Sequence, residues 1–140
     1  MTHKKNLSNV TFVPRQDKKN MKNLWSICDV SLISLKNTKL FSTVIPSKIF
    51  ESMALQKPII MGVEGESKQI IKDANCGIFI EPQNHLDLVK VISKYRNDKN
   101  YLFTLGKNGY NHLTQYYSRE VLAKKMMSKI SSAINTNENK

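Results

Sequence analysis

The chain has 140 residues, of which 40% are hydrophobic and 24% are charged. This length suits one domain with a sizeable core, and the composition is typical of a globular protein and excludes an intrinsically disordered chain. No apolar run approaches the roughly 20 residues of a membrane-spanning helix. The formal net charge of +11 favours polyanions in general as partners, such as nucleic acid, anionic lipid or phosphate-bearing ligands.

The cysteines and histidines give no sign of a metal or redox site. Cys28 and Cys76 form no Cys-x-x-Cys pair, and His3, His85 and His112 are scattered along the chain. We therefore expect two buried free thiols in a reducing cytoplasm, no metal site and no cofactor.

The first third of the chain alternates strand-like and helix-like segments. Val10–Val13 is β-branched and aromatic and ends at Pro14, which is typical of a strand. Apolar residues recur at helical spacing over Asp17–Cys28, which predicts an amphipathic helix with Asp17 as its N-cap. Val30–Leu35 is mostly apolar, which predicts a strand buried on both faces.

The same alternation continues after a loop over Lys36–Ile45. Pro46 suits the first turn of a helix, and Lys57-Pro58 ends that helix. We expect strands at Ile59–Val63 and Gly77–Glu81, with a short helix from about Glu66 between them. Asn84 is expected to cap the next helix, with Asp87 in its first turn.

The C-terminal part is expected to be helical throughout. The pattern beyond Asn97 is interrupted at Gly106 and Gly109, and a last helix is expected from Ser118 to roughly Ile130. We assign residues 1–134 to one partial domain and residues 135–140 to a frayed polar tail.

Strictly alternating strands and helices predict an α/β fold. We expect a Rossmann-like parallel sheet of about four strands with flanking helices and a helical C-terminus. Ligands of such sheets bind beyond the carboxyl ends of the strands, where loops lead into helices. The loop before Pro46 leaves the strand Val30–Leu35 at this edge. Ser47, Lys48 and Glu51 are therefore expected where the fold binds its ligand.

The residue types at this edge match a nucleotide. The first turn of a helix offers free N–H groups to a phosphate, and Ser47 and Lys48 add a hydroxyl and an ammonium group. The Glu51 carboxylate can accept two hydrogen bonds from a vicinal diol such as a ribose. The alternative is purely structural, because acidic residues favour the first turn of any helix and Lys48 with Glu51 is an ordinary i, i+3 pair.

A longer stretch of sequence points to one family. "IPSKIFESMALQKPIIMGVEGESKQIIKDANCGIFIEPQN" resembles the donor-nucleotide half of GT-B glycosyltransferases of family 4. The resemblance is to the bacterial branch that builds O-antigen, capsule and colanic-acid-type polysaccharides. "NVTFVPRQDKKNMKNLWSICDVSLISL" upstream and "GKNGYNHLTQYYSREVLAKKM" downstream are similar to neighbouring parts of the same domain, so the resemblance spans about Asn9 to Ile130.

The resemblance implies roles for particular residues. Glu51 matches the glutamate that holds the ribose hydroxyls of the sugar nucleotide. Residues Ile45, Pro46, Ser47 and Lys48 match the loop and helix start at the pyrophosphate. Arg15 and Gln16 match a segment near the base, and Gly65 and Glu66 match a loop near the donor. Thr43 stands where many members carry a second glutamate, so no catalytic residue is assigned.

The resemblance also implies an activity. The family transfers a hexosyl or N-acetylhexosaminyl group, with retention, from a nucleotide donor that we expect to be UDP-linked. The acceptor is expected to be lipid-linked or a polysaccharide, and the enzyme to lie in the cytoplasm or peripherally at the inner face of the plasma membrane. The basic C-terminal helix with Lys124, Lys125 and Lys129 is a candidate membrane contact, with an ordinary solvated helix face as the alternative.

The chain resembles only part of such an enzyme. An acceptor-binding N-terminal half and the first two strand–helix units of the donor domain have no counterpart, so we expect a truncated form that is inactive alone. One alternative is a non-catalytic remnant or subunit that docks on a complementary glycosyltransferase fragment. The other is a basic nucleic-acid-binding module, which the presence of only Arg15, Arg96 and Arg119 disfavours. We expect no nucleic-acid partner.

Overall fold

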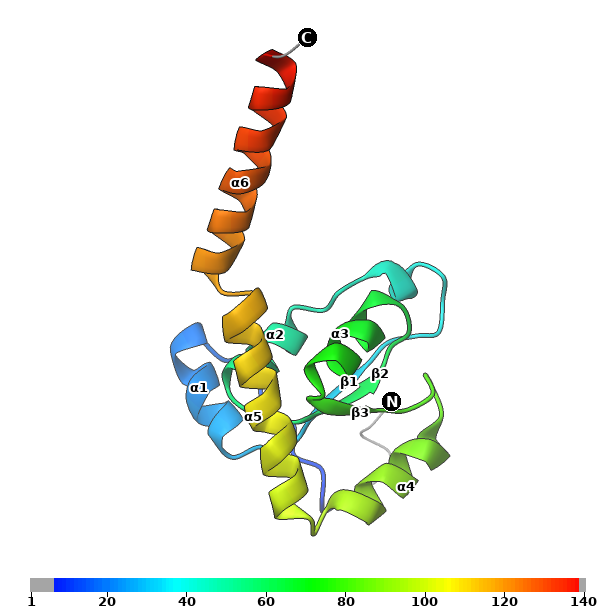
Figure 1. Cartoon of the computed structure of the whole chain (residues 1–140). Coiled ribbons are helices and arrows are strands. Elements are labelled where there is room, and N and C mark those ends of the chain that lie inside the picture. The colour runs from blue at the N-terminus through cyan, green and yellow to red at the C-terminus, as the bar shows by residue number, and fades with distance from the viewer. Residues whose placement is uncertain (1–6, 139–140) are drawn as a thin grey trace.

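Three short parallel strands form the sheet of this protein. The structure, a computed structural model, describes residues 7–138. Strands β1 (Ser31–Ser34), β2 (Ile59–Gly62) and β3 (Gly77–Phe79) pair in the order β1-β2-β3. Helical segments lie between successive strands, as parallel pairing requires, so the expected Rossmann-like α/β class is confirmed (Figure 1).

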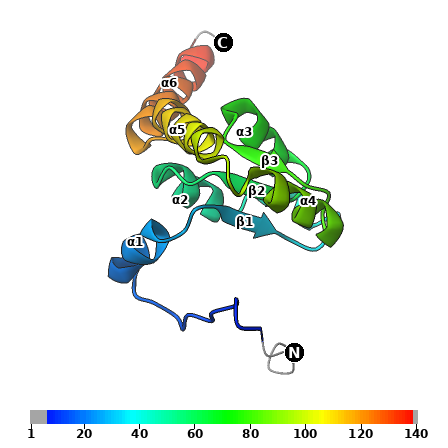
Figure 2. The same cartoon turned by 90° about the horizontal axis from the view of Figure 1, so that it is seen from below.

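Helices cover the two faces of the sheet unequally. Helices α2, α3 and α5 pack on one face, whereas α4 lies on the other (Figure 2). The described helices are α1 (Lys18–Ser26), α2 (Lys48–Ala54), α3 (Glu66–Ala74), α4 (His85–Tyr95), α5 (Lys99–Tyr116) and α6 (Arg119–Glu138), with a 3-10 turn η2 at Phe41–Thr43.

The core lies between the sheet and α2 and α3. Strand alternation sends Ser31 and Ile33 of β1 into this core and leaves Leu32, on the other face, 50% exposed. All four residues of β2 are buried, as expected for the central strand. The core cluster consists of Ile33, Ile49, Met53, Ile59, Met61, Val63, Ile70, Ile71, Ala74 and Cys76.

Three of the described helices begin with a side-chain cap, and Asp17 stands at the N-cap position of α1 as predicted, but its side chain makes no cap hydrogen bond. The Asn84 side chain accepts a hydrogen bond from the N–H of Asp87 at 3.0 Å, as predicted. Ser118 starts α6 by accepting from the N–H of Val121 at 3.3 Å. The N–H of Tyr101 donates to Asp98 at 3.0 Å and starts α5. Each cap satisfies an N–H that has no partner inside its own helix.

The predicted strand at Val10–Val13 is wrong. This segment forms no strand in the structure, and Phe12 in it is 70% exposed. A strand needs a neighbour for its backbone hydrogen bonds, and the three strands in residues 7–138 pair only with one another. In a doubly wound sheet with strand order 3-2-1-4-5-6, Val10–Val13 would be strand 3 and β1 would be strand 4. These two strands are not neighbours in that order.

The predicted interruptions at Gly106 and Gly109 are also wrong. Helix α5 is continuous through both positions, and each glycine lies close against a neighbouring element: a Cβ at Gly106 would overlap the Gln56 backbone, and one at Gly109 would be tight against Cys76 and Met53. Helix α6 runs to Glu138, beyond the expected end near Ile130. The expected frayed tail is therefore helical up to Glu138, and its last two residues, like residues 1–6 of the assigned domain, lie outside the described range.

Candidate functional site

The connections that follow the three strands meet at the carboxyl edge of the sheet. Residues 35–47 follow β1, residues 63–65 follow β2, and residues 80–84 follow β3. The N–H of Asn37 in the first connection donates to the Gln83 side chain in the third at 2.9 Å. The edge is thus lined by segments that are distant in sequence and close in space.

The start of α2 presents Ser47 and Glu51 side by side. The Ser47 hydroxyl donates to Oε1 of Glu51 at 3.3 Å, and both residues are exposed. Glu51 therefore points toward the beginning of the helix, where the first connection arrives. Because α2 has only seven residues, its dipole is small and side chains must supply most of any attraction for an anion.

Thr43, Ile45, Pro46 and Lys48 lie on the same approach to α2. The Thr43 hydroxyl donates to the carbonyl of Leu40 at 2.8 Å, which leaves its oxygen able to accept. Ile45 packs against the core cluster, whereas the side chain of Lys48 is exposed. The carbonyl of Pro46 accepts from the N–H of Ile49 at 3.1 Å and starts the first turn. The structure therefore brings these predicted residues together with Ser47.

Gly65 and Glu66 lie at the start of α3, next to η2. A Cβ at Gly65 would sit 2.0 Å from the backbone oxygen of Ser42, so the two backbones are in contact there. The buried Ser67 hydroxyl donates to the carbonyl of Val44 at 2.8 Å. The start of α3 and the residues leading to α2 therefore form one surface, and Glu66 is exposed on it.

Arg15 and Gln16 lie on a different part of the molecule. They precede α1, and the contact that the structure shows for Gln16 is a local bond from its amide to the carbonyl of Pro14 at 3.0 Å. In Figures 1 and 2 this segment runs on the α1 side of the sheet, apart from η2. The structure therefore does not bring Arg15 and Gln16 to the start of α2.

Sequence reasoning missed a charged group at this edge. Lys68 forms an ion pair with Glu64 at 3.1 Å and lies 3.7 Å above the ring centroid of Phe79. The i, i+4 spacing of Glu64 and Lys68 is visible in the sequence, and it follows directly after β2. The contact with Phe79 depends on the pairing of β2 with β3, which no local signal reveals.

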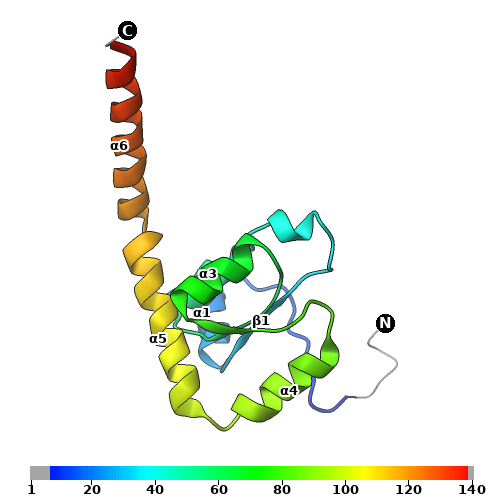
Figure 3. The same ribbon diagram turned by 45° about the vertical axis from the view of Figure 1, so that its right-hand side comes forward.

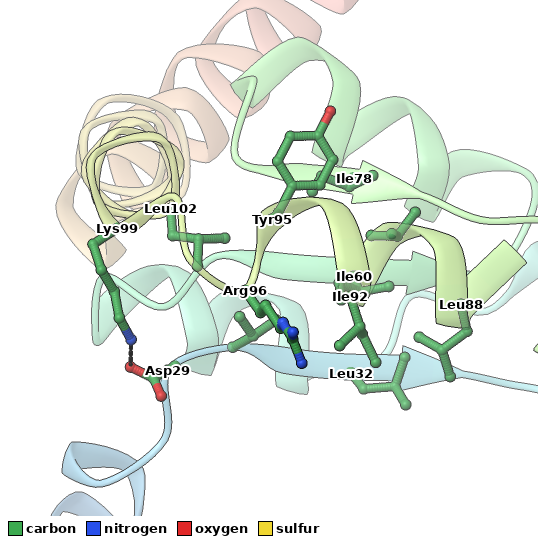
Figure 4. Close-up of a pocket in the computed structure, with 12 residues that line it drawn as sticks. Asp29, Leu32, Ile60, Ile78, Leu88, Ile92, Tyr95, Arg96, Lys99 and Leu102 are labelled. Atoms are coloured by element: carbon green, nitrogen blue, oxygen red, sulfur yellow. Dashed lines mark hydrogen bonds and ion pairs between the residues drawn. The ribbon is translucent and has the colours of Figure 1, made fainter.

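An apolar cavity lies away from this edge. It has a volume of about 290 Å³ and separates the exposed face of the sheet from α4, with an Asp29–Lys99 ion pair at one end (Figure 4). Leu32, Ile60 and Ile78 form its floor, and Leu88 and Ile92 are among the residues that α4 contributes. It includes none of the residues predicted to bind a nucleotide.

Comparison with known proteins decides the family. A profile of the family described as Glycosyl transferases group 1 matches residues 1–112. The chain belongs to this glycosyltransferase family. No curated protein and no solved structure gives a match. Membership implies a nucleotide-sugar donor and an acceptor, and the matched residues include the whole carboxyl edge of the sheet.

Helix α6 of this glycosyltransferase lies outside the matched residues. Helix α6 begins at Arg119, after the match ends, and projects away from the rest of the molecule (Figure 3). Its exposed apolar side chains are Leu122, Met126, Met127, Ile130 and Ile134. None of the described helices is long and apolar enough to cross a membrane.

The remaining reactive groups of the glycosyltransferase suit a structural role. Burial raises the pKa of Cys76 to about 12, so this thiol stays protonated and packs as an apolar group. Cys28 is a free thiol at the end of α1 and is partly buried. Within residues 7–138, no cluster of His, Cys, Asp and Glu side chains suits a metal ion.

Proposed function

We propose that the chain is the donor-binding part of a glycosyltransferase that uses a UDP-linked sugar. It transfers a hexosyl or N-acetylhexosaminyl group, with retention, to a lipid-linked or polysaccharide acceptor in the synthesis of cell-surface polysaccharide, as in the polysaccharide branch of family 4. The observation that carries the proposal is the pairing of Ser47 with an exposed Glu51 at the carboxyl edge of a parallel sheet.

Glu51 holds the ribose in this proposal. One oxygen of its carboxylate accepts from Ser47, and a carboxylate has about four acceptor positions on two oxygens. It therefore keeps enough capacity for both hydroxyls of a ribose. The bond from Ser47 directs the Glu51 side chain toward the start of α2 before any ligand arrives, and such prior orientation lowers the entropy cost of binding.

The residues before and at the start of α2 hold the pyrophosphate. Lys48 supplies a positive charge, and Ser47, Thr43, Ile45 and Pro46 supply the loop against which the phosphates lie. When the bond between sugar and β-phosphate breaks, negative charge grows on the departing UDP, and Lys48 stabilises it. The proposal places Gly65 and Glu66 beside the donor. It does not assign the base to Arg15 and Gln16, because these residues lie apart from the start of α2. It assigns no catalytic residue, metal or cofactor.

Replacing Glu51 tests the ribose assignment. Glu51→Gln removes a charged acceptor, and hydrogen bonds to charged groups contribute about 1.5–3 kcal/mol, so UDP binding should weaken about tenfold or more. Binding should be measured by calorimetry with UDP and with inorganic pyrophosphate. Pyrophosphate lacks a ribose and should bind no more weakly to Glu51→Gln than to the unchanged chain, because the substitution removes a negative charge.

The matched control is Glu120→Gln, which makes the same charge change on α6. Glu120→Gln should leave UDP binding unchanged or slightly stronger, because it removes a negative charge from the protein. Equal weakening by both variants would show that the loss is not specific to Glu51. If Glu51→Gln lost UDP binding and pyrophosphate binding equally, Glu51 would act at the phosphates and not at the ribose.

The isolated chain should bind UDP only weakly and transfer no sugar. Ser47, Lys48 and Glu51 are all exposed to solvent. Water therefore screens every charge that the site offers. Turnover of a UDP-sugar by the purified chain, abolished by Glu51→Ala, would contradict this expectation.

A second candidate function is docking on a complementary glycosyltransferase polypeptide. The observation in its favour is the open edge of β1. The N–H of Ser31 donates to Pro58, just before β2, and that of Leu35 donates to Gly62 of β2. By alternation the backbone groups of Leu32 and Ser34 point away from β2. Size-exclusion chromatography of the chain alone tests this candidate: self-association or aggregation supports it, and a monomer that unfolds cooperatively counts against it.

We also propose a peripheral contact with the inner face of the plasma membrane through α6. Leu122, Met126 and Ile130 recur every four residues and form one stripe on the helix, flanked by Lys125 and Lys129. Lysines near an anionic bilayer contribute about 1 kcal/mol each, and apolar side chains add to this when they enter the interface.

Vesicle sedimentation tests the membrane contact. The chain should sediment with vesicles of anionic phosphatidylglycerol and not with phosphatidylcholine alone. Ile130→Glu should abolish sedimentation, whereas Ser128→Glu adds the same charge on the opposite face and should preserve most of it. Equal losses in both variants would show that charge alone acts, and the apolar stripe would have no role.

A further inference from the structure

Residues 35–47 form the longest connection at the carboxyl edge. They hold every residue before α2 that the proposed function places at the phosphates, yet η2 is their only helical turn. A loop without regular structure binds weakly unless other parts of the protein hold it in its binding conformation. The contacts that hold this loop therefore bear on donor binding.

Ser67 makes the most direct of these contacts. It lies in the first turn of α3, and its side chain is fully buried. Its hydroxyl donates to the carbonyl of Val44 at 2.8 Å, across 23 positions in sequence. Val44 stands immediately before Ile45 and Pro46, so the bond fixes the backbone where it turns into α2.

Gly65 supports the same part of the loop. It adopts φ +80°, and a Cβ there would sit 2.0 Å from the Ser42 oxygen, so only glycine allows this approach. Ser42 belongs to η2, whose turn is closed by bonds from Thr43 to Leu40 and from Val44 to Phe41 at 3.2 and 3.4 Å. The first turn of α3 thus contacts the loop at two points, Ser42 and Val44.

We propose that Ser67 is a positioning residue for the sugar donor. Its hydroxyl holds the carbonyl of Val44 and so keeps the loop of residues 35–47 in the conformation that binds the phosphates. This inference rests on the proposed function of that loop. Ser67 does not touch the donor. Its loss leaves Ser47 and Glu51 in place but lets the backbone before them move, so affinity falls without any change in the groups that contact UDP.

Ser67→Ala tests the proposal through two measurements. Without ligand, the amides of Ser42, Thr43 and Val44, which are hydrogen-bonded in the structure, should exchange with solvent about tenfold faster. In calorimetry, the Kd for UDP should rise about fivefold, in line with the loss of one ordinary hydrogen bond.

The control is Ser31→Ala, another buried serine whose hydroxyl bonds to a second serine, Ser52, at 2.8 Å. Ser31 lies on β1 outside the loop, and Ser52 keeps its bond to the carbonyl of Lys48 at 2.7 Å when the Ser31 hydroxyl is removed. It should lower the melting temperature by a similar amount, with no faster exchange at residues 42–44 and an unchanged Kd for UDP. If Ser67→Ala does not fold, Ser67→Cys has a similar shape and a weaker donor, and should give smaller changes of the same kind.

The outcomes separate this inference from the proposed function. If the wild-type chain binds UDP and Ser67→Ala binds it equally well, the positioning role is overturned and the proposed function stands. If exchange at residues 42–44 is the same in both serine variants, the hold on the loop is overturned. If the wild-type chain shows no UDP binding, the proposed function fails, and the donor role of Ser67 fails with it.

Discussion

Two glycines on α5 allow this helix to lie against its neighbours. A Cβ at Gly106 would sit 2.1 Å from the backbone oxygen of Gln56, and one at Gly109 would sit 3.1 Å from Cβ of Cys76. Glycine inside a helix costs about 1 kcal/mol relative to alanine. The close contact of α5 with the end of α2 and with the core offsets this cost, so the helix continues where the sequence suggested an interruption.

Gly106→Ala should therefore destabilise the protein despite the higher helix propensity of alanine. The methyl group would overlap a backbone carbonyl, which cannot move without shifting the turn after α2. Overpacking of this kind costs about 1–3 kcal/mol, measurable by urea unfolding. Lys107→Ala, at an exposed neighbouring position, should change stability by less than about 0.5 kcal/mol. A more stable Gly106→Ala variant would show that α5 does not pack as described.

The helices and strands that the sequence predicts correctly are those that depend on neighbouring residues in the chain. The apolar run of β2 predicts a strand, because burial on both faces requires consecutive apolar residues. Asn84 and Asp87 predict the start of α4, because capping requires particular residues within one turn of each other. Val10–Val13 carries the same local marks as a strand but lacks a partner, and pairing is not a local property.

The candidate site divides in the same way. The Ser47–Glu51 bond joins residues four apart on one helix, and a helical prediction brings such residues together. The bond from Ser67 to Val44 and the one from Asn37 to Gln83 join distant segments that meet only when the sheet forms. Sequence patterns contain no spacing that would reveal them.

Helix α6 should contribute little to the stability of the remaining protein. From Leu122 to Ile134 its side chains are exposed, and among the described helices it contacts mainly α5. A chain that ends at Lys125 should retain its free energy of unfolding within about 1 kcal/mol, measured by chemical denaturation. A much larger loss would mean that α6 folds back onto the sheet in solution.

In the molecule as a whole, three helices pack on one face of the sheet, and the proposed donor site lies at the carboxyl ends of its strands. Helices α2, α3 and α5 bury the first face, while Leu32 remains exposed on the second and β1 is an open edge. At the carboxyl edge, Ser47, Lys48 and Glu51 lie at the start of α2, and the start of α3 contacts the loop that leads to it. The proposed donor site of this glycosyltransferase rests on this arrangement.

The most direct test of this account is a map of the UDP-binding surface. Titration of UDP into the isotope-labelled chain, followed by backbone amide NMR shifts, locates the ligand without requiring tight binding. The account predicts shifts concentrated at residues 43–51 and 65–66, with smaller shifts for 2′-deoxy-UDP because Glu51 then holds only one hydroxyl. Shifts concentrated around the cavity under α4, or none at millimolar UDP, would contradict it.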